Sequence, residues 1–290
     1  MDLHLQDTST MPAPHVLITG GSRGIGLSIA TAFARNAYRC TLVSRSEESL
    51  KEAVSHLDDV SRTASTTSAV EPPTTHSFIA GDISSNSFWS SSGIGTYLPM
   101  GRDHANKINV LVNCAGLTQT RLFQQTDTEE IERILDTNLR SVLVGTRFLL
   151  RNRYFHARVN DGAINCSIIN VASLLATHGG HGAVVYAASK AGVLGFTRAL
   201  STELGRQGIR VNAIVPGYVE TDMTKGTFYV VSLLVFCGCP YRPWLSTIQS
   251  QISTMPHSQL AFPSDVWANL KKLHLLRCSL RKMSTHTIAL

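Results

Sequence analysis

The stretch His15-Val-Leu-Ile-Thr-Gly-Gly-Ser-Arg-Gly-Ile-Gly26 joins an apolar run to a glycine-rich turn near the start of the chain. The run before the glycines is aliphatic and β-branched, which indicates a strand, and apolar residues recur from Ile25 to Phe33 at helical spacing. Glycines between a strand and a helix allow a tight turn and a close backbone approach to a pyrophosphate, which the positive end of the helix stabilises. The stretch therefore predicts a dinucleotide site. A plain turn is the alternative, because glycine is common in turns of every kind.

Strand and helix patterns alternate along most of the chain. Further apolar runs lie at residues 39–44, 78–80, 108–112, 167–172 and 211–215. Such alternation favours a parallel sheet with helices on both faces. At 290 residues and 43% hydrophobic, the chain can bury one sizeable core. We therefore predict a single α/β domain with a Rossmann-type doubly wound parallel sheet. Residues 58–75 and 84–106 interrupt the pattern, and we expect them to be lengthened surface connections.

The end of the second apolar run distinguishes between the two nicotinamide dinucleotides. Dinucleotide folds that prefer NAD place an acid here to bind the ribose 2′-hydroxyl, whereas this chain has Ser44 and Arg45. Arg45 and Arg23 supply two guanidinium groups, whose geometry matches a 2′-phosphate. We therefore expect NADP(H) as cofactor. The alternative is that both arginines are ordinary solvated surface residues.

Tyr186 and Lys190 lie four residues apart, and Tyr186 lies thirteen positions after Ser173. A helix places residues four apart on one face, so an ammonium group beside the phenol would favour its ionised form and lower its pKa. A free phenol titrates near ~10, and a pKa of about 7 would require ~4 kcal/mol of differential stabilisation. Such a group exchanges protons near neutral pH. Tyr186 could then donate a proton to a carbonyl oxygen, which indicates an oxidoreductase.

Taken together and in order, these motifs resemble the classical short-chain dehydrogenase/reductase family, in particular its 3-oxoacyl-acyl-carrier-protein reductase and carbonyl reductase branch. The similarity covers residues 14 to about 225. The residues that carry it are Thr19 to Gly26, Asp82, Asn113-Cys-Ala-Gly116, Asn138, Ser173, Tyr186 with Lys190, and Pro216 to Thr221. The resemblance implies NADPH-dependent reduction of a ketone to a secondary alcohol. The substrate would be a small molecule or an acyl thioester, such as a 3-oxoacyl chain on an acyl-carrier protein.

The resemblance assigns catalytic roles to Asn138, Ser173, Tyr186 and Lys190. In the family, the serine hydroxyl binds the substrate carbonyl, the tyrosine is the proton donor, and the asparagine holds a water that links the lysine to solvent. Each residue has a structural alternative. Ser173 could be a turn serine at a strand end, Asn138 a satisfied buried amide, and Lys190 a solvated helix lysine.

The cofactor contacts that the resemblance implies lie at the carboxyl ends of the predicted strands, where open α/β sheets bind ligands. Asp82 resembles the acid that contacts adenine, although aspartate after a strand is also an ordinary turn former. Residues 113–116 would pass beside the adenosine ribose, and residues 216–221 would touch the nicotinamide carboxamide. The full expected set is Gly20, Ser22, Arg23, Gly24, Ile25, Gly26, Ser44, Arg45, Asp82, Asn113, Ala115, Gly116, Tyr186, Lys190, Pro216, Gly217, Val219 and Thr221.

The six cysteines do not make a disulfide framework in a chain of this length. Cys40, Cys114 and Cys166 fall in or beside apolar runs and look like buried thiols in a reducing compartment. Cys237 and Cys239 lack a nearby His or Cys pair that would complete a metal site, so no metal is expected.

The first fourteen residues contain two acids and no Arg. This composition fits neither a secretory signal nor a convincing mitochondrial presequence. We expect a cytoplasmic protein. A mitochondrial location is the alternative, because relatives serve fatty-acid synthesis there.

Residues 227–290 depart from the family pattern. They contain one acid and six Lys or Arg, so most of the formal net charge of +6 lies there. The family's substrate lid and last strand are not recognisable in this segment. We therefore divide the chain into an N-terminal extension (1–13), an NADP-binding domain (14–226) and an atypical tail (227–290). We hypothesise that an altered reading frame or a retained intron produced the tail. If the tail is real, we expect the parallel sheet to end with an uncovered edge.

The composition of the tail also allows predictions about binding partners. Its basic residues are spread thinly and are not interleaved with aromatic residues, so we expect no nucleic acid. Its apolar run at residues 228–236 is too short to span a bilayer, which takes about 20 residues, so no membrane partner is expected. Relatives form homo-oligomers, but the altered end puts this in doubt here. The altered end also leaves two alternative readings of the chain: a catalytically impaired dinucleotide-binding subunit and a misfolded fragment.

Overall fold

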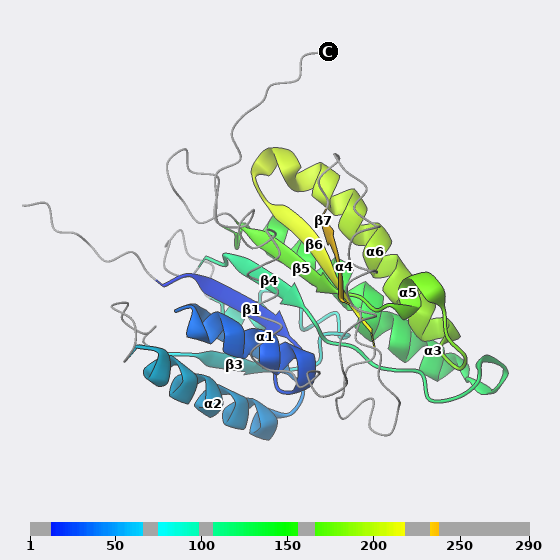
Figure 1. Cartoon of the computed structure of the whole chain (residues 1–290), viewed down its shortest axis with the longest axis horizontal. Helices are drawn as coiled ribbons and strands as arrows, with labels where there is room; N and C mark the ends of the chain where they lie inside the picture. The colour runs from blue at the N-terminus through cyan, green and yellow to red at the C-terminus, as the bar shows by residue number, and fades with distance from the viewer. Residues whose placement is uncertain (1–12, 66–74, 99–106, 156–165, 218–232, 238–290) are drawn as a thin grey trace, which may run out of the picture.

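The computed structural model describes residues 13–65, 75–98, 107–155, 166–217 and 233–237. The strands among them form one sheet in the order β3-β2-β1-β4-β5-β6-β7. Their bounds are β1 His15–Thr19, β2 Arg39–Ser44, β3 Ser77–Ala80, β4 Val110–Asn113, β5 Ser167–Val171, β6 Arg210–Pro216 and β7 Leu233–Cys237. The first six strands pair in parallel, as Figure 1 shows. The predicted doubly wound sheet is confirmed.

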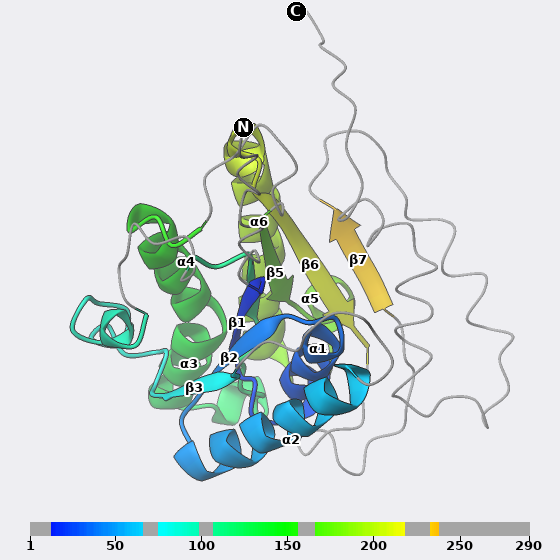
Figure 2. The same cartoon turned by 90° about the vertical axis from the view of Figure 1, so that its left-hand side faces the viewer.

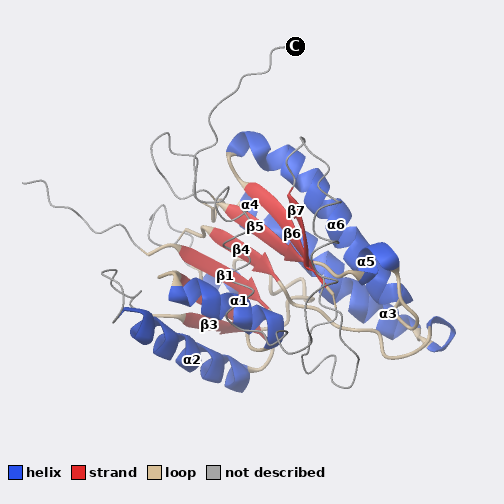
Figure 3. Ribbon diagram, viewed as in Figure 1, coloured by secondary structure: helices blue, strands red, loops and turns tan. Residues whose placement is uncertain are grey.

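Helices cover both faces of this sheet (Figures 2 and 3). The longer helices are α1 Gly24–Arg35, α2 Glu47–Ser65, α3 Thr128–Leu135, α4 Ser141–Arg151 and α6 Val184–Leu204. The shorter ones are η1 Ile94–Thr96, η3 Phe123–Gln125, the π-turn η4 Asp136–Arg140, α5 Leu175–His178 and η5 Gly205–Gln207. The connection from each strand to the next in the parallel sheet runs over one face or the other, as the alternating pattern predicted.

The buried side chains of β1 show why its whole run is apolar. Val16 and Ile18 pack into a cluster with residues of α1 and α2, such as Ala30 and Leu50. Leu17 points to the opposite face and joins a cluster that includes Leu149 of α4 and residues of α6. Successive side chains of a strand point to opposite faces, so a strand covered on both faces is apolar at every position. This places the glycine turn that follows β1 at the edge of a rigid core.

The long connection after β3 carries several buried apolar side chains in the described residues up to 98. Phe88, Trp89 and Ile94 are at most 8% exposed and belong to the core cluster on the α4 face. The Trp89 indole N–H donates to the Ile83 carbonyl at 2.8 Å, and its ring lies against Gly145 of α4. The segment is thus a surface connection in most of its described residues, but one anchored in the core by apolar side chains that the prediction did not foresee. Its apolar side chains fill space on the sheet face beside α4.

The other insert also begins differently from the prediction. Residues 58–65 are the last turns of α2, and Ser61 is 4% exposed with a hydrogen bond to His76. The polar composition of this segment concealed a helix, because only a narrow side of it faces the core. Residues 66–74 of this insert lie outside the described part of the chain.

A strand lies beside β6. β7 pairs with β6 in antiparallel register, with Ala213 opposite Phe236 (Figure 2). The expectation that β6 would form an uncovered edge is therefore wrong, and part of the segment 227–290 joins the sheet. The backbone of Leu233–Cys237 pairs with backbone groups of β6 that an edge strand would leave unpaired.

Candidate active site

The carboxyl ends of β1, β4, β5 and β6 lie at one edge of the sheet (Figure 1). Thr19 pairs with Asn113, and Asn113 pairs in turn with Asn170. Ser173 follows β5 closely, and Gly217 follows β6. Because parallel strands in register end together, the structure brings the predicted residues that follow these four strands to a common edge.

The glycine turn is close-packed. Gly20 has φ +69°, and a Cβ on it would lie 2.7 Å from the Ala115 Cα. A Cβ on Gly26 would lie 2.1 Å from the Gly20 carbonyl oxygen. The Gly20 N–H donates to the Val43 carbonyl at 2.8 Å, which ties the turn to β2. Side chains at positions 20 and 26 would push the turn apart, so glycine is required for this geometry.

The turn has the shape and the donor chemistry to hold a pyrophosphate. α1 begins at Gly24, which has φ +55°, and its first turn contains no acid. The free N–H groups and the dipole of a helix N-terminus favour an anion. Ser22 donates a hydrogen bond to Ser44 at 3.1 Å and so joins the turn to the end of β2. Arg23 and Arg45, the residues that follow Ser22 and Ser44 in the chain, are exposed.

Asp82 lies exposed after β3 and forms a turn. Its Oδ1 accepts from the Ser84 N–H at 2.9 Å and from the Ser84 hydroxyl at 2.8 Å. The turn-former interpretation is thus observed, while an adenine contact stays a prediction. Arg140 of the π-turn η4 donates to the Ser84 carbonyl at 3.0 Å and to Asn86 at 2.9 Å. This side chain joins the loop after β3 to the segment that carries Asn138.

The Asn113 side chain points into the sheet. It is 4% exposed and donates to Asn170 Oδ1 at 2.8 Å and to the Thr146 hydroxyl at 3.2 Å. We therefore expect the backbone, and not this side chain, to make the cofactor contact at this position. The backbone N–H groups of Cys114 and Ala115 are bonded to the Thr19 hydroxyl at 3.2 and 3.4 Å. These bonds hold residues 113–116 against the end of β1.

Pro216 and Gly217 close the site at the end of β6. Pro216 is buried, and its carbonyl accepts from the Leu174 N–H at 2.8 Å, next to Ser173. Two further predicted contacts of the cofactor, Val219 and Thr221, lie outside the described residues.

Asn138 is fully buried in the π-turn and has partners at both ends of its amide. Its Oδ1 accepts from the Leu117 N–H at 2.7 Å, and its Nδ2 donates to the Leu117 carbonyl at 2.9 Å and to Ser189 at 3.1 Å. The structure therefore shows the satisfied core amide that was the alternative interpretation. A Cβ on Gly116 would lie 3.4 Å from both Asn138 Oδ1 and Lys190 Nζ. Asn138 thus lies near Lys190, and its role in a water relay stays a prediction.

Ser173 lies near Tyr186 in the structure. Ser173 is 8% exposed, and its hydroxyl oxygen accepts from the Leu175 N–H at 3.2 Å. Burial raises the pKa of Tyr186 above its ordinary value of 10.0, a hydrogen bond with the Ser173 side chain opposes this rise, and the nearby Cys114 adds to it. The predicted lowering of the Tyr186 pKa is therefore wrong for the chain alone, because burial outweighs the opposing effect of Ser173.

Lys190 is a buried neighbour of the Tyr186 ring. The side chain is 4% exposed, its Nζ lies 6.0 Å from the centre of the Tyr186 ring, and it donates to the Val171 carbonyl at 2.8 Å. Burial lowers the pKa of Lys190 to about 8, with a smaller opposing effect from Cys114. Lys190 is thus no solvated helix lysine. It is a buried amine whose protonation changes near neutral pH.

Two buried polar residues near this site were not predicted. Gln119 is 7% exposed and accepts from the Val185 N–H at 2.8 Å, at the start of the helix that carries Tyr186. Ser189 is fully buried and joins Asn138 to the Tyr186 carbonyl. Ser189 directly precedes Lys190, which was a usable signal. Gln119 lies in a polar loop whose sequence shows no periodicity, so its partner was not visible.

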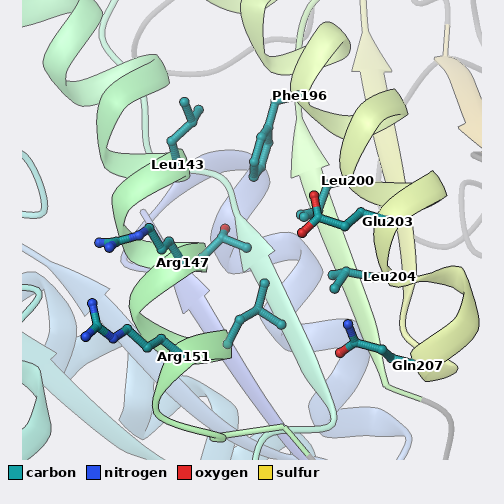
Figure 4. A pocket seen from close by; sticks show the side chains of 10 residues that line it. Leu143, Arg147, Arg151, Phe196, Leu200, Glu203, Leu204 and Gln207 are labelled. Atoms are coloured by element: carbon teal, nitrogen blue, oxygen red, sulfur yellow. The ribbon is translucent and has the colours of Figure 1, made fainter.

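A hollow on another face lies between α4 and α6, with a volume of about 360 Å³ (Figure 4). Its lining includes Arg147 and Arg151 from α4 and Phe196 and Glu203 from α6. No sequence-predicted site residue lines it, so it lies apart from Tyr186. The described residues contain no cluster of three or more metal-ligating side chains. No helix among them is both long enough and apolar enough to traverse a bilayer.

Comparisons with known proteins agree with this geometry. A family model described as short chain dehydrogenase matches residues 14–229. The chain is 36% identical over 210 residues to 3-oxoacyl-[acyl-carrier-protein] reductase FabG of Chlamydia muridarum, covering 72% of this chain and 75% of that protein. It is 34% identical over 208 residues to the Homo sapiens 3-oxoacyl-[acyl-carrier-protein] reductase, covering 72% and 76%.

Solved structures show the same likeness. An actinorhodin polyketide ketoreductase variant, solved with NADPH, matches with a TM-score of 0.61 and 29% identity, covering 74% of this chain and 75% of that one. A putative short-chain alcohol dehydrogenase from Sinorhizobium meliloti 1021 matches with a TM-score of 0.59 and 30% identity, covering 74% and 76%.

Proposed function

We propose a function from one premise: this chain belongs to the short-chain dehydrogenase family, and is therefore an oxidoreductase built to bind a nicotinamide dinucleotide. We propose that it reduces a ketone to a secondary alcohol with NADPH, and that the substrate class is a 3-oxoacyl thioester. The observation that carries the proposal is the placement of the buried Lys190 6.0 Å from the centre of the Tyr186 ring, with the buried Ser173 near the same phenol. The names of the relatives, 3-oxoacyl-carrier-protein reductases and a ketoreductase, support the substrate class.

When bound, the reduced nicotinamide supplies the hydride that adds to the carbonyl carbon. The chain's own part is to hold the carbonyl oxygen and to give it a proton. The Ser173 side chain lies close enough to Tyr186 to lower the pKa of its phenol against the effect of burial. An oxygen placed between them could therefore accept from both. A hydroxyl pair fixed in this way orients the substrate and stabilises the developing charge on its oxygen.

The raised pKa of Tyr186 fits the role of a proton donor. A phenol that stays protonated at neutral pH is the form that can give its proton to an alkoxide oxygen. Lys190, with a pKa of about 8, changes its protonation near the working pH and can stabilise the phenolate electrostatically once the proton has left. Asn138 and Ser189 hold the π-turn against α6 and so fix the helix face on which both residues lie.

We propose NADPH as the hydride donor because of the groups at the end of β2. Arg23 and Arg45 directly follow Ser22 and Ser44, the two residues that a hydrogen bond joins. Positions 45 and 46, which follow β2, hold no acid. Two guanidinium groups suit a 2′-phosphate, whereas an acid would suit a free ribose hydroxyl. We further propose that an acyl-carrier protein carries the substrate. We also propose that the protein works in the cytoplasm.

The proposal is tested by NADPH oxidation with acetoacetyl thioester, and with a quinone as the competing substrate class. Tyr186→Phe should abolish the ketone-dependent rate and leave the NADPH dissociation constant within about twofold, because it removes a single hydroxyl. Turnover retained in Tyr186→Phe would refute the proton donor. NADPH binding by the wild-type chain without turnover of any ketone would favour a catalytically impaired dinucleotide-binding subunit instead.

A further inference from the structure

We propose that Gln119 is a positioning residue for this reaction: it caps the first turn of α6 from the loop that follows β4 and thereby sets the place of Tyr186. The inference depends on the proposed function, since Tyr186 is its proton donor. Gln119 lies three residues after Gly116, which faces Lys190 Nζ. It thus connects the wall of the site built from residues 113–116 with the helix that carries Tyr186 and Lys190.

The start of α6 needs a cap from elsewhere in the chain. The residue before its first turn is Ala183, whose methyl group cannot accept a hydrogen bond. The first N–H groups of a helix have no intrahelical partner. Val185 is 5% exposed, so water does not satisfy its N–H, and a buried N–H left unpaired destabilises the fold. Gln119 Oε1 accepts from this N–H at 2.8 Å.

The Gln119 amide is held at its other end as well. Its Nε2 donates to the Arg121 carbonyl at 2.7 Å and to the Thr126 hydroxyl at 3.3 Å. The Val185 N–H can only donate and the Arg121 carbonyl can only accept, so the hydrogen-bond network fixes the orientation of the amide. The side chain is 7% exposed and has partners on both sides. The donor bonds thus settle which end of the amide faces the Val185 N–H, and the acceptor at that end is the part of Gln119 that caps α6.

The loop itself is anchored on either side of Gln119. Leu117 exchanges two hydrogen bonds with the Asn138 amide. Thr120 donates to the Glu130 carboxylate from its N–H at 2.9 Å and from its hydroxyl at 2.7 Å, and these bonds lower the pKa of Glu130. The loop thus has a fixed place relative to the π-turn and α3. Through the hydrogen bond from the Val185 N–H, Gln119 holds the start of α6 in a set position relative to this loop.

Tyr186 directly follows Val185 in the first turn of α6. Its hydroxyl must meet Ser173, which stands on a different element at the end of β5. A helix end without a cap frays, and its first residues then lose their fixed position. A shift of about 1 Å in a reacting group can lower a rate as much as ~100-fold. Loss of the Gln119 cap should therefore act on the rate of the chemical step rather than on cofactor binding.

Two substitutions separate the cap from the rest of the loop. Gln119→Met keeps the length and removes both the acceptor and the donors. Gln119→Glu keeps an acceptor for the Val185 N–H, which suits the positive end of the helix, and loses the donors to Arg121 and Thr126. We expect kcat for acetoacetyl thioester to fall about tenfold or more in Gln119→Met and to stay within about threefold in Gln119→Glu. The NADPH dissociation constant should change less than about twofold in both.

Amide hydrogen exchange supplies a readout that does not depend on turnover. The Val185 and Tyr186 amides should exchange at least about tenfold faster in Gln119→Met, and near the wild-type rate in Gln119→Glu. An unchanged kcat in Gln119→Met would overturn the proposal, as would an equal loss of kcat in both variants, since the loop-side donors would then matter instead. If Gln119→Met does not fold, Gln119→Glu decides alone: loss of its kcat or of its Val185 protection overturns the proposal. If the wild-type chain reduces no ketone, the proposed function fails, and hydrogen exchange still decides whether Gln119 caps α6.

Discussion

The Lys190 ammonium nitrogen lies 6.0 Å from the centre of the Tyr186 ring and donates a hydrogen bond of 2.8 Å to the Val171 carbonyl. Both side chains are shielded from water, so burial opposes the charged form of each. Burial lowers the pKa of Lys190 to about 8 and raises that of Tyr186. The phenol is therefore protonated at neutral pH, while the amine is held charged at a cost in stability.

Lys190→Met should stabilise the folded chain at pH 7. The folded-state pKa of about 8 lies below the ordinary 10.5, so the unfolded chain binds this proton more tightly. One pK unit corresponds to ~1.4 kcal/mol, and after allowing for the lost bond to Val171 we expect a gain of roughly 2 kcal/mol. Urea unfolding at pH 7 measures it.

The pH dependence is the control for this prediction. Wild-type stability should rise between pH 8 and 10.5, because the unfolded chain binds more protons in that window, and Lys190→Met should lack this component. A difference between the two proteins that is the same at pH 7 and pH 10 would show that the buried charge is not its cause.

Acid should destabilise the chain through His15. This side chain is 2% exposed; burial and the nearby Arg39 lower its pKa to about 3, with a small opposing effect from Lys107. Arg39 can only donate to His15 Nδ1, so Nε2 carries the proton and donates to Thr41. The contribution of neutral His15 is fully present above about pH 6.5 and is lost as the pH falls toward 3, by up to roughly 5 kcal/mol.

His15→Gln tests this assignment. A glutamine can accept from Arg39 and donate to Thr41, but it does not titrate. We expect its unfolding free energy to fall less steeply than that of the wild type between pH 6.5 and 4.5. Parallel stability curves in this range would mean that His15 is not the titrating group. His76, whose pKa burial also lowers, remains in both proteins and cancels in the comparison.

Trp89 and Gly145 should be energetically coupled. A Cβ on Gly145 would lie 2.5 Å from the Trp89 ring, so Gly145→Ala should force the indole out of its place. Removal of a buried tryptophan costs about 3–5 kcal/mol, and we expect Trp89→Ala to lie in this range. In the Trp89→Ala background, Gly145→Ala should be close to neutral or stabilising, because alanine favours a helix interior by about 1 kcal/mol over glycine.

The double-mutant cycle measures this coupling directly. We expect an interaction energy of at least ~1 kcal/mol. Additive effects of the two substitutions would mean that the segment after β3 does not pack on α4 in solution.

Arg45→Asp should change the preference for the cofactor. Arg45 is exposed, so the substitution should alter the free energy of unfolding by less than about 0.5 kcal/mol. Loss of a charged hydrogen bond to a 2′-phosphate, worth about 1.5–3 kcal/mol, should weaken NADPH binding about 10–100-fold. NADH binding should be unchanged or tighter. Equal losses for NADPH and NADH would place the 2′-phosphate elsewhere.

Much of the site could be predicted because its signals are local. The glycines at positions 20 and 26 are required by contacts within their own turn and with the adjoining backbone, and the strands of the sheet were visible as continuous apolar runs. The helical spacing of Tyr186 and Lys190 likewise placed both on one face of α6. Parallel strands in register bring their carboxyl ends together, which places Ser173 after β5 at the same edge of the sheet as the glycine turn.

The features that could not be predicted depend on tertiary packing, which decides which side chains are shielded from water and which segments become neighbours. A sequence shows that an amine lies four residues from a phenol, but the direction of the phenol pKa depends on burial, which the packing of distant segments decides. The same holds for Trp89 in a segment that reads as polar surface, and for β7, whose direction beside β6 follows from the path of the chain.

The sequence by itself determined the strand-turn-helix order, the glycine geometry and the residue types available for proton transfer, since these follow from short-range sterics and hydrophobic periodicity. Only the tertiary structure decided that Tyr186 is held protonated, that Asn138 is held by Leu117, and that Gln119 closes the end of α6. The physical reason is that desolvation and hydrogen-bond partners are properties of groups far apart along the chain, which become neighbours only when the sheet has formed.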